Sequence, residues 1–390
     1  MSLKFKYLIC ILVLSNLLAY AQEELSLEAI YNSSKYSSDY QSQVFWISQG
    51  EAYITIAHNK NKESQLIKHS SKNGNESIFL SSQALTPIGA TKALNVEAFS
   101  LSDDNTKVLI FTNSRKVWRS NTRGDYWLYD FKESKLSQIG KQFPASSLMF
   151  AKFSNDNNKV AYVHDFNIYI EQLNTGTTKQ LTSDGSTTHI NGTFDWVYEE
   201  EFGMRDGFSW SSDDEHIAFW QLDASQTGTF YMINTTDSLY SKPIPIQYPK
   251  VGQSPSKAKV GIINTKDGAN HWIPIPGDPV QHYLPGMQWV SKDLLLIQQI
   301  NRKQNQLIVY SYQVNSRELK KVYTENHSAW VDLRYPDISS NHWGGNELLL
   351  TDSNKYFLRM TEGDAWRHVY KISIATGEKI LLTPGAYDVA

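Results

Sequence analysis

Cysteine is almost absent from this sequence of 390 residues. The one cysteine, Cys10, lies inside an apolar run near the N-terminus, so the chain beyond that run has no thiol. A disulfide framework and a cysteine-ligated metal site are therefore excluded there, and stability must come from a buried core. A lipid-modified Cys10 is the minor alternative, because the residue comes before most of the apolar run instead of after it.

The sequence also lacks a strong excess of charge of either sign. Its formal net charge is −3, and 20% of its residues are charged. A nucleic-acid-binding surface usually needs a basic excess, so this balance argues against nucleic acid as a partner.

Long apolar runs are missing as well. The run from Tyr7 to Leu18 is shorter than the ~20 residues that a membrane-spanning helix needs. Lysines precede it, and the stretch Ala19-Tyr20-Ala21 after it fits the cleavage pattern of a secretory signal. We therefore expect residues 1–21 to be a signal peptide and the mature chain, from Gln22, to be periplasmic or extracellular with no membrane span. A signal anchor is the alternative.

Aromatic residues, by contrast, are abundant: they make up 13% of the chain, with 22 Tyr and 11 Trp. The pleated surfaces of β-sheets favour such side chains. Five segments repeat an aromatic residue, a polar turn and a short apolar strand, and they align Phe99, Phe153, Trp210, Trp289 and Trp343. Successive aromatic residues are 54, 57, 79 and 54 positions apart. A period above 50 residues is close to that of four-stranded propeller blades with long loops.

With an imperfect first unit around F-W-I-S-Q-G, the sequence predicts an all-β propeller of about six four-stranded antiparallel blades over residues 41–390, after an extension at 22–40. The long interval after Trp210 contains S-K-P-I-P-I-Q-Y-P-K-V-G-Q-S-P, whose prolines exclude a central strand, so we expect an inserted arm or edge extension. The chain ends at L-L-T-P-G-A-Y-D-V-A, directly after a strand and turn that should lead into another unit. We therefore expect the propeller to be open.

Three consecutive glutamates stand in an otherwise apolar segment, T-F-D-W-V-Y-E-E-E-F-G-M, at residues 193–204. Asp195 can cap a short helix there and Gly203 can end it. A charged run is usually a solvated face. Here the flanking aromatic residues would hold the helix against a blade. The carboxylates of the helix would then be partly removed from water, and carboxylates in that position require a cation.

The neighbourhood of the glutamates limits which cation that is. The absence of nearby Cys and His argues against zinc, and calcium would need more oxygen ligands. A primary ammonium has three donors and a full charge, and adjacent carboxylates keep it charged. We therefore expect no metal and no cofactor, and a peptide N-terminus as the ligand.

The segment D-W-V-Y-E-E-E-F, followed by R-D-G-F-S-W-S-S-D, resembles the signature of the dipeptidyl peptidase IV family of serine peptidases, in the prolyl oligopeptidase clan. The resemblance implies an eight-bladed propeller in which two adjacent glutamates on a short helix bind the free N-terminus of a peptide. By position these would be Glu200 and Glu201, with Glu199 preceding the pair.

Two further segments extend this resemblance. The segment V-W-R-S-N-T-R-G-D-Y-W-L-Y-D resembles the one in which an arginine binds a substrate carbonyl, which would be Arg119; a surface arginine of the blade is the alternative. The proline-rich segment resembles the family's arm, which implies a possible homodimer through Ser225–Gly252.

The chemistry of that family also requires a serine nucleophile in a G-x-S-x-G elbow. The sequence has no such elbow: G-F-S-W-S around Ser209 lacks the second glycine, and G-Q-S-P-S around Ser254 is a proline-rich loop. We therefore assign no catalytic residue and expect about two blades and the α/β-hydrolase half to be absent.

The expected function is the substrate-recognition propeller of an exported serine dipeptidyl peptidase, inactive by itself. A non-catalytic peptide-binding or assembly propeller is the alternative.

Overall fold

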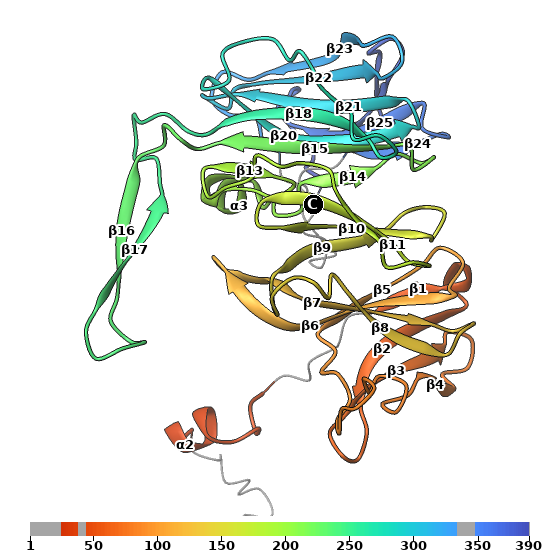
Figure 1. Cartoon of the computed structure of the whole chain (residues 1–390). Coiled ribbons are helices and arrows are strands. Elements are labelled where there is room, and N and C mark those ends of the chain that lie inside the picture. The colour runs from red at the N-terminus through yellow and green to blue at the C-terminus, as the bar shows by residue number, and fades with distance from the viewer. Residues whose placement is uncertain (1–24, 38–43, 334–347, 390) are drawn as a thin grey trace, which may run out of the picture. The chain divides into compact units, whose positions relative to one another are not determined.

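The structure is a computed structural model that describes residues 25–37, 44–333 and 348–389 (Figure 1). The chain divides into two compact units, Met1–Ser42 and Gln43–Ala390. The described part of the first unit contains the short helix α2 (Leu27–Tyr31), whose N-terminus is capped by the side chain of Ser26. The expected signal peptide lies outside the described residues. In the parts of the chain that the structure describes, no helix is long and apolar enough to cross a membrane.

The second unit is built from antiparallel sheets, which confirms the all-β prediction. Most blades have four strands, blades 2 and 3 are joined into one eight-stranded sheet, and blade 4 has five strands because its first strand is interrupted. The strands of blades 1 to 3 are β1 (Phe45–Ile47), β2 (Ala52–His58), β3 (Ser64–Ser70) and β4 (Glu76–Leu80); β5 (Ala98–Leu101), β6 (Lys107–Val117), β7 (Ser120–Asp130) and β8 (Lys135–Ile139); and β9 (Leu148–Phe153), β10 (Lys159–His164), β11 (Asn167–Gln172) and β12 (Thr178–Gln180). A 3-10 turn, η1 (Ser48–Gly50), joins β1 to β2.

Three more blades follow along the chain. The strands of blades 4 to 6 are β13 (His189–Asn191), β14 (Phe208–Trp210), β15 (His216–Asp223), β18 (Lys257–Asn264) and β19 (Asn270–Trp272); β20 (His282–Ser291), β21 (Leu294–Asn301), β22 (Gln306–Gln313) and β23 (Glu318–Asn326); and β24 (Leu349–Thr351), β25 (Tyr356–Thr361), β26 (His368–Ser373) and β27 (Lys379–Leu381). Among the described residues, neither a strand pairing nor a buried apolar cluster joins blade 6 to blade 1, as expected for an open propeller.

Among the described residues, five buried apolar clusters each lie between two successive blades. Strand β15 contributes residues to two of these clusters. Ile217 and Phe219 belong to the cluster shared with blade 3, whereas Ala218 and Trp220 belong to the cluster shared with blade 5. Because alternate residues point to opposite faces of a strand, a continuous apolar run buries both faces of the blade. Each blade is therefore stabilised by its neighbours, as in other repeat folds.

A shared hairpin turn explains the sequence repeat. In the part of the chain that the structure describes, four blades share a turn in which a serine hydroxyl donates a hydrogen bond to the aspartate two residues later: Ser102 to Asp104, Ser154 to Asp156, Ser211 to Asp213, and Ser291 to Asp293. After this turn Val160 pairs with Phe153 and Ile217 pairs with Trp210, which confirms that these two aromatic residues are equivalent.

The alignment of Phe99 with these residues is wrong by two positions. In blade 2 it is Leu101 that pairs across the turn, with Val108. Phe99 and Leu101 lie on the same face of β5, because alternate residues of a strand share a face, so the apolar pattern could not separate them. Trp289 pairs with Leu295 at the corresponding place in blade 5, and Trp343 lies outside the described residues.

The predicted arm is a separate two-stranded ribbon of β16 (Thr229–Asn234) and β17 (Lys242–Gln247), inserted between β15 and β18 of blade 4 (Figure 1). Both of its strands are edges, which is where a strand tolerates proline, and β17 contains Pro243 and Pro245.

Candidate functional site

The glutamate segment interrupts the first strand of blade 4. Strands β13 and β14 both pair with β15, one with each half of it, and residues 192–207 leave the sheet between them. Three backbone hydrogen bonds of 3.0 Å close the neck of this insertion: Gly192 N to Trp220 O, Gly207 N to Gly192 O, and Trp220 N to Gly207 O. The insertion, which we call the glutamate loop, is thus anchored by the ladder of the blade itself.

The glutamate loop contains the helix α3 (Trp196–Phe202), with the ends that the sequence predicts. The side chain of Asp195 accepts a hydrogen bond from Tyr198 N at the N-terminus, and Gly203 adopts the left-handed conformation (φ 68°) at the C-terminus. Asp195 also accepts a hydrogen bond from the buried Ser256. Burial raises the pKa of Asp195 even though these donors act to lower it. The cap therefore sits in the protein interior.

Aromatic side chains hold α3 against blades 4 and 5. Tyr198 is fully buried, and its hydroxyl accepts a hydrogen bond of 3.1 Å from Leu284 N. The carbonyl of Leu284 in turn accepts a hydrogen bond from Trp220 Nε1 (3.0 Å). A register shift in β20 next to Leu284 leaves both backbone groups available for these side chains. On the other side of the helix, the Trp196 ring packs against Tyr248, with 4.4 Å between ring centroids.

The three glutamates lie in three different environments. Glu199 is buried, with 6% of its side chain exposed, and its Oε1 lies 3.1 Å from Arg205 Nε. Burial raises the pKa of Glu199, and Arg205 opposes this shift. Glu200 is partly exposed at 27%, and Glu201 is exposed. Consecutive helical residues point about 100° apart, so one glutamate faces the interior while its neighbours face outward.

Arg119 lies at the tip of the long β6–β7 hairpin, and it meets the glutamate loop there. Its Nε and Nη2 donate hydrogen bonds of 2.6 and 2.7 Å to the two carboxylate oxygens of Glu200. Its backbone N also donates to Glu199 Oε1 (3.4 Å). The Arg119 side chain is 71% exposed. Trp118, the other residue of the tip, has a φ of 52°, which is uncommon for a bulky side chain and marks a tightly constrained turn.

The structure thus brings together two of the three residues that the sequence singled out, Arg119 and Glu200, and places Glu201 next to them on α3. The direct ion pair between Arg119 and Glu200 was not anticipated. Bidentate pairing of this kind fixes both partners in a plane.

Sequence reasoning missed the residues that support the helix. One of these residues is Arg205, described above, and another is Asp206. The carboxylate of Asp206 accepts two hydrogen bonds of 2.5 Å from Lys152 Nζ. Lys152 comes from β9 of blade 3, and its Nζ also lies over the Phe208 ring. Burial raises the pKa of Asp206, and Lys152 opposes the shift. The sequence did contain a signal for these supporting residues, namely the adjacent opposite charges Arg205 and Asp206 inside an apolar segment. Charges there are unfavourable unless each has a partner from elsewhere in the fold.

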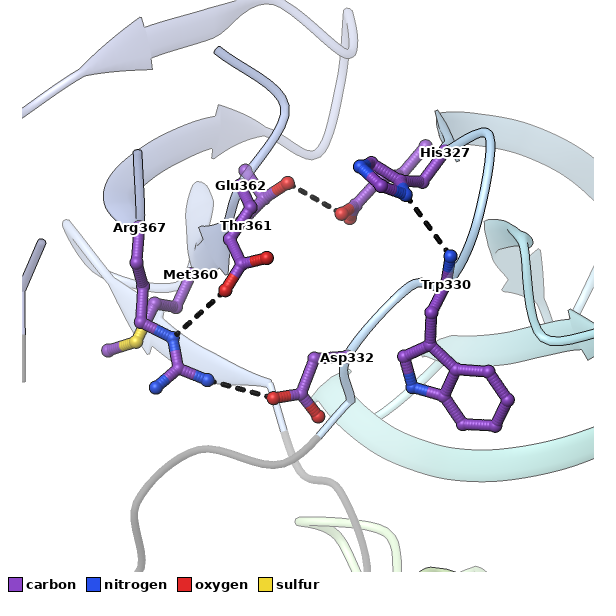
Figure 2. Close-up of a pocket in the computed structure, with 8 residues that line it drawn as sticks. His327, Trp330, Asp332, Met360, Thr361, Glu362 and Arg367 are labelled. Atoms are coloured by element: carbon purple, nitrogen blue, oxygen red, sulfur yellow. Dashed lines mark hydrogen bonds and ion pairs between the residues drawn. The ribbon is translucent and has the colours of Figure 1, made fainter. Parts of the chain in front are cut away.

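Away from the glutamate loop, a polar pocket of about 20 Å³ lies between blades 5 and 6 (Figure 2). The charges in it have partners within the protein: Arg359 donates to Glu325 (2.8 Å), and Arg367 donates to Asp332 (2.8 Å). The volume suffices for about one water molecule. This network therefore joins the two blades.

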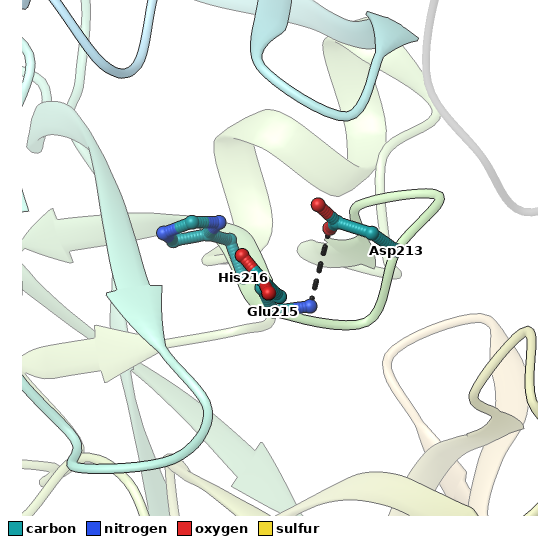
Figure 3. Close-up of side chains that lie close together, drawn as sticks. All are labelled: Asp213, Glu215 and His216. Atoms are coloured by element: carbon teal, nitrogen blue, oxygen red, sulfur yellow. Dashed lines mark hydrogen bonds between the residues drawn. The ribbon is translucent and has the colours of Figure 1, made fainter.

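Asp213, Glu215 and His216 place three potential ligand atoms within 4.8 Å of one another on the β14–β15 turn (Figure 3). Asp213 occupies the aspartate position of the shared turn, where it accepts hydrogen bonds from Ser211 Oγ and Glu215 N. The same arrangement in blades 2 and 3 has lysine in place of His216. The blade turn accounts for the cluster, so we assign it no metal.

Comparisons with known proteins agree with this architecture. The "Dipeptidyl peptidase 4" of Trichophyton rubrum is 28% identical over 296 residues, which is 73% of this chain and 37% of that protein. The "Dipeptidyl aminopeptidase B" of Saccharomyces cerevisiae is 27% identical over 355 residues, 76% of this chain and 43% of that protein. The chain thus spans less than half of the length of these relatives.

A solved structure has the same fold. The crystal structure of Porphyromonas gingivalis dipeptidyl peptidase 4 matches with a TM-score of 0.82 at 24% sequence identity, covering 94% of this chain and 50% of that chain. Residues 102–390, well over half of the sequence, match the family described as "Dipeptidyl peptidase IV (DPP IV) N-terminal region". With its blades, its glutamate loop and this match, the chain belongs to the dipeptidyl peptidase IV N-terminal region family.

Proposed function

We propose that this chain is the substrate-recognition propeller of an exported serine dipeptidyl peptidase. In this proposal Glu200 and Glu201 bind the free ammonium of a peptide, and Arg119 binds a carbonyl oxygen near it. A hydrolase domain would then cleave at a fixed distance from the bound N-terminus and so release dipeptides. Distance from the anchored end is the basis of the specificity, because positioning converts the reaction into an intramolecular one.

The pairing of Glu200 with a cation is the observation that carries this proposal. Both carboxylate oxygens of Glu200 already accept N–H hydrogen bonds from the guanidinium of Arg119. A carboxylate held at a rigid helix, with an exposed carboxylate one residue later, offers a similar arrangement to an ammonium group. Glu199 does not compete for the ammonium, because its own charge is already paired with Arg205.

The test is a calorimetric titration of the chain with a short Xaa-Pro peptide and with the same peptide N-acetylated. We expect only the free amine to bind. The Glu200→Gln and Glu201→Gln variants should each weaken binding roughly tenfold or more, since a hydrogen bond to a charged group contributes about 1.5–3 kcal/mol. Glu215→Gln, an exposed glutamate of the same blade outside the loop, is the matched control. Equal binding of both peptides would refute the proposal.

A second candidate function, assembly, is supported by the arm. The residues of β16 are almost all exposed although the strand reads T-F-Y-M-I-N, and Tyr231 and Ile233 are 63% and 69% exposed. Exposed apolar surface of this kind marks an interaction site. We propose a homodimer through the arm, Ser225–Gly252. Sedimentation of the chain should then show a dimer that Tyr231→Ser/Ile233→Ser converts to a monomer; a monomeric wild-type chain would contradict it.

A further inference from the structure

The β6–β7 hairpin carries more positive charge than the proposed amine site uses. Besides Arg119 at its tip, it presents Arg115, Lys116 and Arg123 within nine residues of sequence. Arg115 and Lys116 are exposed and Arg123 is partly exposed. Within the described residues, none of these three side chains forms an ion pair with a carboxylate, although Arg119 does.

Two of these cations face each other across the ladder. Arg115 pairs with Arg123, and the register shifts on both sides of this pair. Like charges directly opposite each other destabilise a strand pair, and β-bulges often re-aim side chains beside functional sites. The fold therefore keeps an unfavourable arrangement at this place.

Two carboxylates that contact residues beside this pair are already engaged elsewhere. Glu97 accepts hydrogen bonds from the backbone N and hydroxyl of Ser114. Asp125 accepts hydrogen bonds from the side chain of Asn113 and from Ser146 N. Both acids are thus engaged by uncharged donors, and an anion from outside the chain would complete the charge balance of the hairpin.

We propose that Arg115 and Arg123 bind a carboxylate of the peptide whose N-terminus is held at Glu200 and Glu201. This inference rests on the proposed function and adds a preference for acidic peptides. Arg123 in β7 comes four residues after Arg119 at the hairpin tip, about 13 Å away at 3.3 Å per residue. An extended peptide covers that distance in about four residues. The third to fifth residues of the substrate are therefore the ones whose acidic side chains reach the hairpin.

The experiment uses two C-terminally amidated peptides with the sequence Ala-Pro at the N-terminus, followed by three glutamates in one and three glutamines in the other, each also in an N-acetylated form. Calorimetry on the full chain at low salt should show the glutamate peptide binding roughly three- to tenfold more tightly, because each exposed charge pair contributes a few-fold in affinity. The difference should shrink in high salt, where exposed charges are screened.

Three variants assign the effect to the hairpin. The double variant Arg115→Gln/Arg123→Gln should bind both peptides equally, the charge-preserving Arg115→Lys/Arg123→Lys should retain the preference, and Lys303→Gln, an exposed cation of blade 5, should leave it unchanged. An unfolding midpoint no lower than that of the wild type confirms that the double variant is folded, since removing two opposed charges should not destabilise the strand pair.

The outcomes separate this inference from the proposed function. If binding requires the free amine but the two peptides bind equally to the wild type, the hairpin inference is wrong and the amine site stands. The inference is also wrong if the preference survives in the double glutamine variant. If acetylation has no effect, the amine site is wrong, whereas a preference lost with Arg115 and Arg123 would still support an anion site on the hairpin.

Discussion

The neck of the glutamate loop offers the most direct perturbation of the site that leaves every charged group in place. A Cβ added at Gly207 would lie 2.7 Å from Gly192 C and 2.7 Å from Thr193 N. Both contacts are with backbone, so the Gly207→Ala variant can relieve them only by opening the neck. Overpacking of this kind costs about 1–3 kcal/mol. Two neck hydrogen bonds involve Gly207, and each contributes about 0.5–1.5 kcal/mol. We expect a total loss of about 2–6 kcal/mol in the free energy of unfolding.

Gly203→Ala in the same loop is the matched control. Gly203 has a φ of 68°, and a Cβ there would meet no atom within 4 Å. Its cost is therefore backbone strain alone, about 1–2 kcal/mol for an L-residue in the left-handed region. Urea unfolding followed by tryptophan fluorescence measures both losses, and titration with a free-amine peptide measures the consequence for the site. We expect Gly207→Ala to abolish peptide binding and Gly203→Ala to retain most of it.

Two results would contradict the proposed role of the neck. If Gly207→Ala changes the unfolding free energy by less than about 1 kcal/mol, or if the two variants lose the same peptide affinity, then the neck does not position α3. The support of Glu200 would then have to come from the ion pairs and aromatic contacts alone.

Three further predictions concern single polar side chains, two beside the glutamate loop and one in the hairpin turn of blade 2. Tyr198→Phe removes the hydroxyl that accepts from Leu284 N and should lower the unfolding free energy by about 1–3 kcal/mol, because a buried donor is left unsatisfied; an unchanged urea midpoint would contradict this. Lys152→Met leaves the carboxylate of Asp206 unpaired, and because burial raises its pKa, stability should recover as the pH falls from 7 toward 5; a variant that loses further stability on acidification would count against the pairing. Burial alone would raise the pKa of Asp104, but hydrogen bonds lower it to about 2, so its stabilisation is present above pH ~4 and is lost as the pH falls toward 2. Asp104→Asn should therefore lower the unfolding midpoint at pH 6 and make little difference near pH 2, and a constant difference across that range would refute the assignment.

Much of the fold follows from local patterns. A continuous apolar run such as that of β15, preceded by a Ser-x-Asp turn, defines a strand buried on both faces and a hairpin before it, and both properties are local. The helix α3 was predictable for the same reason, because its cap at Asp195 and its end at Gly203 depend on neighbouring residues. The register of blade 2 could not be predicted in this way. Phe99 and Leu101 share a face of β5, and only the pairing with the neighbouring strand distinguishes them.

The sequence by itself determined a β-propeller chain with a glutamate-bearing helix set into one blade, and the residues Glu200, Glu201 and Arg119 as its candidate site. Only the tertiary structure decided that Arg119 pairs with Glu200, that Glu199 is buried against Arg205, and that Lys152 of a different blade holds the end of the loop. The reason is physical: the glutamates and Arg119 are about 80 residues apart in the chain, and the strength of each charge pair depends on burial and on geometry between blades, which no local pattern encodes.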